Sequence, residues 1–244
     1  MTVEVPSTRV ATVHDRWLAW SRDRFGWLLA LLVANYIILM ILPGEGISGL
    51  IGALAVGITA LFALDCSAAP RRLRIVARTM VAVIPILPVL YLVGLHSVRA
   101  SIPLSMAAML AVTTFVVLRH LLGHEKVDSA TLLAAIDTYV LLGLVFAEMF
   151  YAFSLMSLAS PFLAQTSIPE RSDLVYLSYV TLTTVGFGDL TPLSKVARTL
   201  VITEALFGQV FLVTAVARIV SLFGQDRRGT PAQDAGVAEE PKTS

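Results

Sequence analysis

The chain has 244 residues, of which 57% are hydrophobic and 14% are charged, and its formal net charge is +1. Soluble domains carry about 25% charged residues, so this composition and a mean hydropathy of +0.80 exclude an ordinary soluble domain and predict a polytopic membrane protein. The near-zero net charge gives no reason to expect nucleic acid or an acidic partner.

Six segments are long and apolar enough to cross the bilayer as helices, since one span requires about 20 mostly apolar residues. Pro85 and Pro88 fall inside the third segment and predict a kink in it. The predicted fold class is an all-α membrane protein with six transmembrane helices. In chain order the six segments are 25–42, 47–64, 75–95, 102–118, 131–153 and 196–223.

The distribution of Lys and Arg predicts the orientation, because cytoplasmic loops carry an excess of both. With a cytoplasmic N-terminus, 14 of the 18 lie inside and 4 outside. Both termini of a multi-pass cell-membrane protein are therefore expected in the cytoplasm. The predicted units are 1–24, an amphipathic interfacial helix or a plain basic flank; 25–126, a four-helix domain; 127–223, a second unit; and 224–244, a disordered tail.

The segment 154–195, between the last two spans, has no uninterrupted apolar run and contains TLTTVGFGDLTP at 181–192. Lipid satisfies no backbone polar group, so irregular backbone at membrane depth must be buried in protein or line a water-filled path. A re-entrant loop meets this requirement. Its first limb is predicted to be a short helix from an N-cap at Asp173 to about Thr183. The negative end of this helix dipole would favour a cation near the membrane centre.

The return limb, TVGFG at 184–188 followed by Asp189, resembles the selectivity filter of the potassium-channel pore-loop family, and the likeness extends over 131–223. The resemblance implies a passive potassium channel, with no enzymatic activity and no cofactor beyond the permeant K⁺. It implies a homotetramer in the lipid bilayer, because each chain supplies one quarter of a ring of oxygens; a heterotetramer is left open. The implied ion-binding residues are Thr184, Val185, Gly186, Phe187 and Gly188, with K⁺ at the first four.

The physics of such a filter explains these residue types. A dehydrated potassium ion needs oxygens in place of its water, and successive carbonyl groups point at one axis only if the backbone alternates its handedness. Gly186 and Gly188 are expected to adopt a positive φ, which glycine does at little cost. Thr184 can add its hydroxyl oxygen, while Val185 and Phe187 are expected to point away from the axis and pack against the pore helix.

The same resemblance implies roles for residues around the filter. Gly208 lies 20 residues after Gly188, where family members often have a hinge glycine, although close helix packing also favours a small residue there. Gln209 follows the hinge candidate and is expected to face a water-filled cavity. The residues expected to support the filter are Tyr176, Val180, Thr183 and Asp189.

Charged residues inside the spans are candidates for function, because charge is costly in hydrocarbon. Helix directions place Asp137 and Arg218 near the inner face, and Glu148 and Arg198 near the outer face. Each pair is expected to lie within ion-pairing or water-bridged reach, within or between subunits; the alternative is that each charge reaches the interface separately. Glu204, about two turns into the last span, is a candidate for supporting the filter from behind.

Other functions remain as alternatives. A weakly selective cation channel would differ in the filter, and the apolar Phe187 argues against it. A secondary transporter would carry an inverted repeat with a second broken helix, and only one pore-loop motif is present. A membrane enzyme would need clustered His, Cys or carboxylates, whereas the four histidines are scattered. Intrinsic voltage sensing is not expected, because 102–118 contains no Lys or Arg.

Overall fold

The computed structural model describes residues 13–42, 46–67, 70–123, 129–156, 161–165 and 169–226. These residues are helical apart from short connections and one isolated bridge, and they contain no strand. The predicted tail, beyond residue 226, lies outside the described residues. The elements are α1 (Val13–Ile41), α2 (Gly46–Cys66), α3 (Arg71–Val83), α4 (Ile86–Leu92), the 3₁₀ turn η1 (His96–Val98), α5 (Ser101–Gly123), α6 (Ser129–Met156), α7 (Arg171–Leu182) and α8 (Lys195–Asp226).

Six stretches of the described chain are long and apolar enough to cross a membrane, as the sequence predicts, so the protein is a multi-pass membrane protein. The third stretch, Arg71–Leu92, consists of α3 and α4. Its helix is interrupted next to Pro85, which has no N–H to donate and whose ring crowds the preceding turn. The predicted kink is therefore confirmed.

The N-terminal segment and the first span form one helix, α1, which begins at Val13. The sequence left residues 1–24 open between an amphipathic interfacial helix and a plain basic flank; the described part of this segment is the start of the continuous helix α1. The stretch that joins the two parts contains no proline and only Gly26 as a weak helix former. A continuous helix therefore satisfies more backbone hydrogen bonds than two helices with a break between them.

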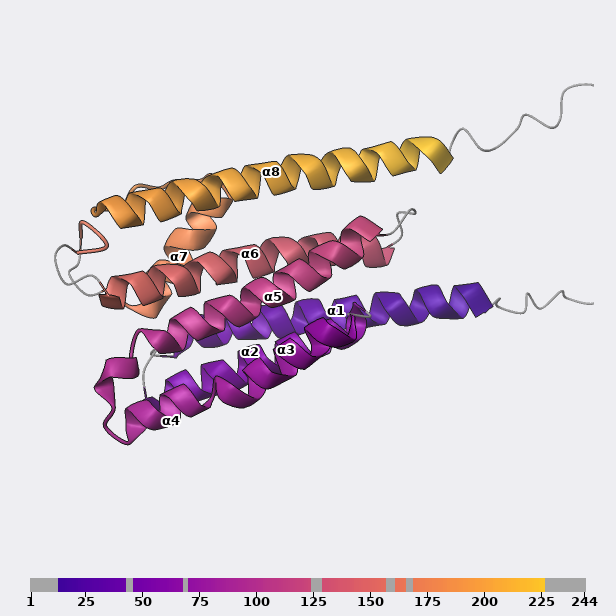
Figure 1. The fold of residues 1–244 in the computed structure, drawn as a ribbon. Coiled ribbons are helices and arrows are strands. Elements are labelled where there is room, and N and C mark those ends of the chain that lie inside the picture. The colour runs from indigo at the N-terminus through magenta and orange to yellow at the C-terminus, as the bar shows by residue number, and fades with distance from the viewer. Residues whose placement is uncertain are drawn as a thin grey trace, which may run out of the picture.

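The long helices run side by side, and α7 lies between α6 and α8 (Figure 1). Both α1 and α5 pack along α6, and α1 also reaches α7. The first turn of α1 and the last turn of α8 lie at the same end of the molecule, as an even number of spans requires (Figure 1). This agrees with placing both termini on one side of the membrane, whereas which side that is stays a prediction.

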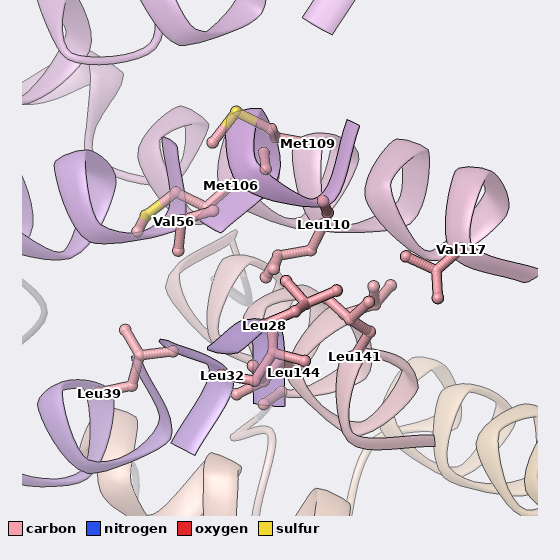
Figure 2. Packing of buried hydrophobic residues seen from close by; sticks show 14 of the residues in the cluster. Leu28, Leu32, Leu39, Val56, Met106, Met109, Leu110, Val117, Leu141 and Leu144 are labelled. Atoms are coloured by element: carbon pink, nitrogen blue, oxygen red, sulfur yellow. The ribbon is translucent and has the colours of Figure 1, made fainter. Parts of the chain in front are cut away.

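One buried apolar cluster holds α1, α2, α5 and α6 together (Figure 2). Within a bilayer such packing gains from dispersion contacts rather than from leaving water, so small residues at the contacts matter. Ala53, Ala60 and Ala134 are fully buried in this cluster and allow close approach of the helices. The predicted four-helix domain and the unit that follows it thus share one core. Among its larger members are Leu28, Leu32, Leu39, Met106, Met109, Leu110, Leu141 and Leu144.

Candidate functional site

The short helix α7 begins three residues earlier than the sequence predicts. Its N-cap is Glu170, and Asp173 stands at the third helical position, where its Oδ2 accepts the backbone N–H of Glu170 at 3.0 Å. The prediction of Asp173 as N-cap is therefore wrong, because the two acidic residues form a reciprocal capping box. The helix ends at Leu182, with Thr183 as its C-cap, close to the predicted end.

Three hydrogen bonds join α6 and α7, each between a side-chain hydroxyl on one helix and a backbone carbonyl group on the other. The Tyr179 hydroxyl donates to the Val140 carbonyl at 2.8 Å, and the Tyr139 hydroxyl donates to the Leu182 carbonyl at 2.8 Å. The Ser178 hydroxyl lies 2.7 Å from the Gly143 carbonyl oxygen. These bonds run in both directions between α6 and α7, so they fix both the depth and the rotation of α7.

Gly143 is the point of closest approach between α6 and α7. A Cβ atom at this position would lie 2.7 Å from Cε1 of the Tyr179 ring, which its hydroxyl bond holds in place. Gly143→Ala is therefore expected to lower the free energy of unfolding by about 1–3 kcal/mol, as overpacking does. Thermal unfolding in detergent would measure this change.

Gly26→Ala is the matched control for that substitution. Gly26 lies within α1, and a Cβ atom there meets nothing within 4 Å. Alanine should therefore stabilise by about 0.5–1 kcal/mol through helix propensity alone. Equal stabilisation by both substitutions would contradict the close contact at Gly143.

The backbone after α7 alternates its handedness. Gly186 has φ 57° and Gly188 has φ 80°, which confirms the positive φ predicted for both. Thr184 also has a positive φ, 60°, which no pattern of residue types predicted and which a β-branched residue rarely adopts. Val185 and Phe187 stand between these positions and do not share the positive φ. Every second residue of 184–188 thus has left-handed backbone.

Carbonyl groups of α7 anchor the start of this segment. The N–H groups of Val185 and Gly186 both donate to the Val180 carbonyl, at 3.0 and 3.4 Å, and the Thr184 N–H donates to Thr181 at 2.9 Å. Val180 thus contacts the segment through its backbone. Thr183 donates its hydroxyl to the Tyr179 carbonyl at 2.6 Å, which closes the last turn of α7.

The side chains of Val185 and Phe187 are largely exposed in the single chain. Val185 is 53% exposed and Phe187 is 70% exposed. Phe187 does stack on Tyr176 of α7, with ring centroids 6.4 Å apart, but Val185 is not packed away. Within the single chain Phe187 thus meets α7 only through Tyr176, and packing of Val185 against a pore helix stays a prediction.

Tyr176 connects α7 to the outer end of the segment. Its hydroxyl donates to Oδ2 of Asp189 at 2.8 Å, so these two predicted supporting residues contact each other. The hydrogen bond to Asp189 raises the pKa of Tyr176. A phenol that stays protonated keeps donating, so this contact is expected to persist under mildly alkaline conditions.

Hydrogen bonds connect the residues after 184–188 to the segment 161–165. Ala164 donates its N–H to Thr191 and Leu193 donates to Phe162, both at 3.0 Å. The Gln165 side chain exchanges hydrogen bonds with the backbone and hydroxyl of Thr191. This explains why the glycine-bearing segment is followed by a polar, proline-containing stretch: it anchors the outer end of the loop.

Gly208 lies against the end of α7. A Cβ atom on it would lie 2.6 Å from Cδ1 and 3.4 Å from the carbonyl oxygen of Leu182, and α8 continues through it without a break. This is the packing role that the sequence left open, while the hinge role stays a prediction. Gln209, the cavity candidate, is exposed in the single chain.

The predicted charge pairs do not form within the described chain. Glu148 pairs with Arg171, whose Nε donates to Oε1 at 2.9 Å, and Arg198 instead donates to the Pro192 carbonyl at 3.3 Å. Within the described chain Glu148 is therefore not paired directly with Arg198, and a contact between subunits stays a prediction. Arg218 donates to the Leu122 carbonyl at 2.9 Å, and among the described residues no donor reaches either carboxylate oxygen of the fully buried Asp137.

Arg171, in the segment between the last two spans, is buried at the first position of α7. Its Nη2 lies 3.3 Å from Sδ of Met106 on α5, and its guanidinium lies 5.7 Å from the ring centre of Tyr151 on α6. Its Nη1 also lies beside Gly52 of α2. One arginine thus joins the start of α7 to three helices of the core.

A buried cation at the N-terminus of a helix opposes the helix dipole, so Arg171 depends on Glu148 for compensation. The sequence carried one signal of this pair. Glu148 was the only acidic residue in the outer half of an otherwise apolar span, and such a residue requires a partner.

Comparison with known proteins agrees with this geometry. Residues 138–225 match a protein family described as "Ion channel". This region covers most of α6, all of α7, the segment with alternating φ and nearly all of α8. No curated protein and no solved structure matches the chain. The match supports an ion-channel pore family for the C-terminal part of the chain.

Proposed function

We propose that the chain is the subunit of a potassium-selective channel, and that K⁺ crosses passively through a pore formed by four copies. One observation carries the proposal: positive φ at Thr184, Gly186 and Gly188, in a loop between two apolar helices. Alternating handedness turns successive carbonyl groups toward one side, where they can replace the water of a potassium ion. The oxygens that bind the ion would then come from Thr184 to Phe187 of each chain.

The position of α7 supports a re-entrant loop. Its 12 residues span about 18 Å, roughly half of a bilayer's hydrocarbon thickness. The chain then returns through 184–188 to contacts with 161–165 on the side where α7 began. The C-terminal end of α7 therefore lies near mid-membrane, where its negative dipole end favours a cation.

The exposed backbone of 184–188 supports an assembly around an axis. Lipid cannot satisfy these polar groups, so in the membrane they require water, ions or neighbouring chains. The exposed apolar face of α8 offers a surface for such neighbours. Closed rings are the usual form of homo-oligomers, and the family resemblance sets the number at four. The exposed apolar residues of α8 include Ile202, Leu206, Val210, Val213 and Val216.

The first four spans give no support for intrinsic voltage sensing. Of the four arginines of α3, Arg71, Arg72 and Arg78 lie exposed and Arg74 is half-buried, and all four lie in its first two turns, where an interfacial position suits them. The long fourth span, α5, carries its only basic residues, Arg119 and His120, near its C-terminal end. The stimulus that opens the channel is thus not expected to be a voltage acting on arginines within these spans.

The direct test is ion flux in liposomes that contain the purified chain. We expect flux of K⁺ well above that of Na⁺, together with a tetramer by cross-linking or mass measurement. Equal flux of both ions would favour the weakly selective cation channel instead. A stable monomer without flux would contradict the proposal, because one chain supplies only a quarter of the ion-binding oxygens.

A further inference from the structure

Glu204 is a fully buried carboxyl group behind α7, on the side away from the exposed face of α8. Its Oε1 lies 2.5 Å from the hydroxyl of Ser178, and that hydroxyl also lies 2.7 Å from the Gly143 carbonyl oxygen. Ser178 is itself fully buried. One hydroxyl thus sits between two oxygens, one from α6 and one from α8.

The number of hydrogens decides the protonation state of this group. A serine hydroxyl has one hydrogen, and a backbone carbonyl only accepts. An ionised Glu204 would also only accept, so one of the two short oxygen contacts would hold no proton and would be repulsive. A neutral carboxyl group supplies the missing hydrogen, and both contacts then become hydrogen bonds.

The surroundings of Glu204 also disfavour an ionised group. Within the described residues no basic side chain pairs with it, and its Oε2 has no donor. A buried carboxylate with a single donor is costly, whereas the neutral acid leaves only one carbonyl-type oxygen without a partner. The titratable groups that face it are the phenols of Tyr139 on α6 and Tyr179 on α7. Both phenols donate to backbone carbonyl groups and give Glu204 no positive charge.

We propose that Glu204 is a neutral carboxylic acid that donates its proton to Ser178, while Ser178 donates to the Gly143 carbonyl. This chain of hydrogen bonds fixes α7 between α6 and α8. Ser178 lies two residues before Val180, whose carbonyl holds the N–H groups of Val185 and Gly186. Glu204 is therefore a positioning residue for the filter segment, and this role rests on the proposed channel function.

The proposal predicts that glutamine at position 204 preserves the function of Glu204, whereas alanine does not. In Glu204→Gln the amide N–H donates to Ser178 as the acid does, so K⁺ over Na⁺ selectivity and thermal stability should stay close to wild type. Glu204→Ala and Ser178→Ala each remove one buried hydrogen-bond partner, so the flux ratio should fall about tenfold. Loss of selectivity in Glu204→Gln equal to that in Glu204→Ala would overturn the proposal.

The pH profile gives a second readout, which a merely structural role would not change. Selective flux of the wild type should fall on the alkaline side, because loss of the proton removes the donor. Glu204→Gln has no proton to lose at this position, so its flux should keep its selectivity over the same pH range. Identical alkaline profiles for the two proteins would contradict the assignment.

Infrared difference spectroscopy tests the proton itself and requires no flux. The spectrum of the wild-type tetramer minus that of Glu204→Gln should contain the carbonyl band of a protonated carboxylic acid at neutral pH. A carboxylate band in its place would overturn the inference even if the channel conducts. If the band is present and no flux is found, the assignment of the proton to Glu204 stands, while the proposed function and the positioning role that rests on it fail.

Discussion

Gly186→Ala is expected to abolish selective potassium flux, whereas Gly94→Ala is expected to leave it unchanged. Both glycines have a positive φ, 57° and 104°, and a Cβ atom at either meets nothing within 4 Å of the single chain. The backbone penalty for an L-residue is about 1–2 kcal/mol per chain at Gly186, and it is larger at Gly94, whose φ lies outside the left-handed region that L-residues adopt. Only at Gly186 does this penalty fall on carbonyl groups that four chains would aim at one ion.

The comparison separates a filter from an ordinary turn. Gly94 lies in the turn between α4 and η1, outside the segment 184–188 and outside the contacts of α7 with α6 and α8. Flux of K⁺ and Na⁺ would be measured in liposomes, with tetramer content as the check on assembly. If Gly186→Ala conducts with normal selectivity, the alternating φ values of 184–188 do not shape an ion path.

Much of this architecture could be predicted from local patterns. The six apolar stretches gave the spans because length and composition alone decide whether a helix can cross a bilayer. Pro85 predicted the break in the third span because proline restricts φ and has no N–H to donate. Gly186 and Gly188 predicted the left-handed backbone because glycine adopts a positive φ at little cost. In each case the cause lies in the residue itself.

The contacts that hold α7 could not be predicted in the same way. The contact of Glu148 with Arg171 was not predicted, because partner choice depends on where Arg171 enters the core, and no local pattern shows that position. Thr184 has a positive φ although a β-branched residue disfavours it, so its residue type alone does not predict this conformation. Ser178 and Gly143 are ordinary residues until two helices bring them together.

Glu148→Leu is expected to lower the free energy of unfolding by about 3–5 kcal/mol, the usual effect of breaking a buried ion pair. The substitution leaves the guanidinium of Arg171 buried at the positive end of α7, where no other described carboxylate binds it. Arg171→Met should have an effect of similar size, because Glu148 then loses both N–H donors. Denaturation of the detergent-solubilised protein would measure both changes.

The double variant Glu148→Leu with Arg171→Met gives the decisive comparison. Two apolar side chains of similar volume should recover most of the lost stability, since buried ion pairs gain little over a well-packed apolar pair. If the double variant is as unstable as the single ones, the lost packing beside Met106 and Gly52 matters more than charge. If the double variant is stable but its ion flux changes, Arg171 does more than hold α7 in place. Its side chain contacts α2 and α5, and its backbone begins α7. Such a result would mean that Arg171 links the first four spans to the proposed filter.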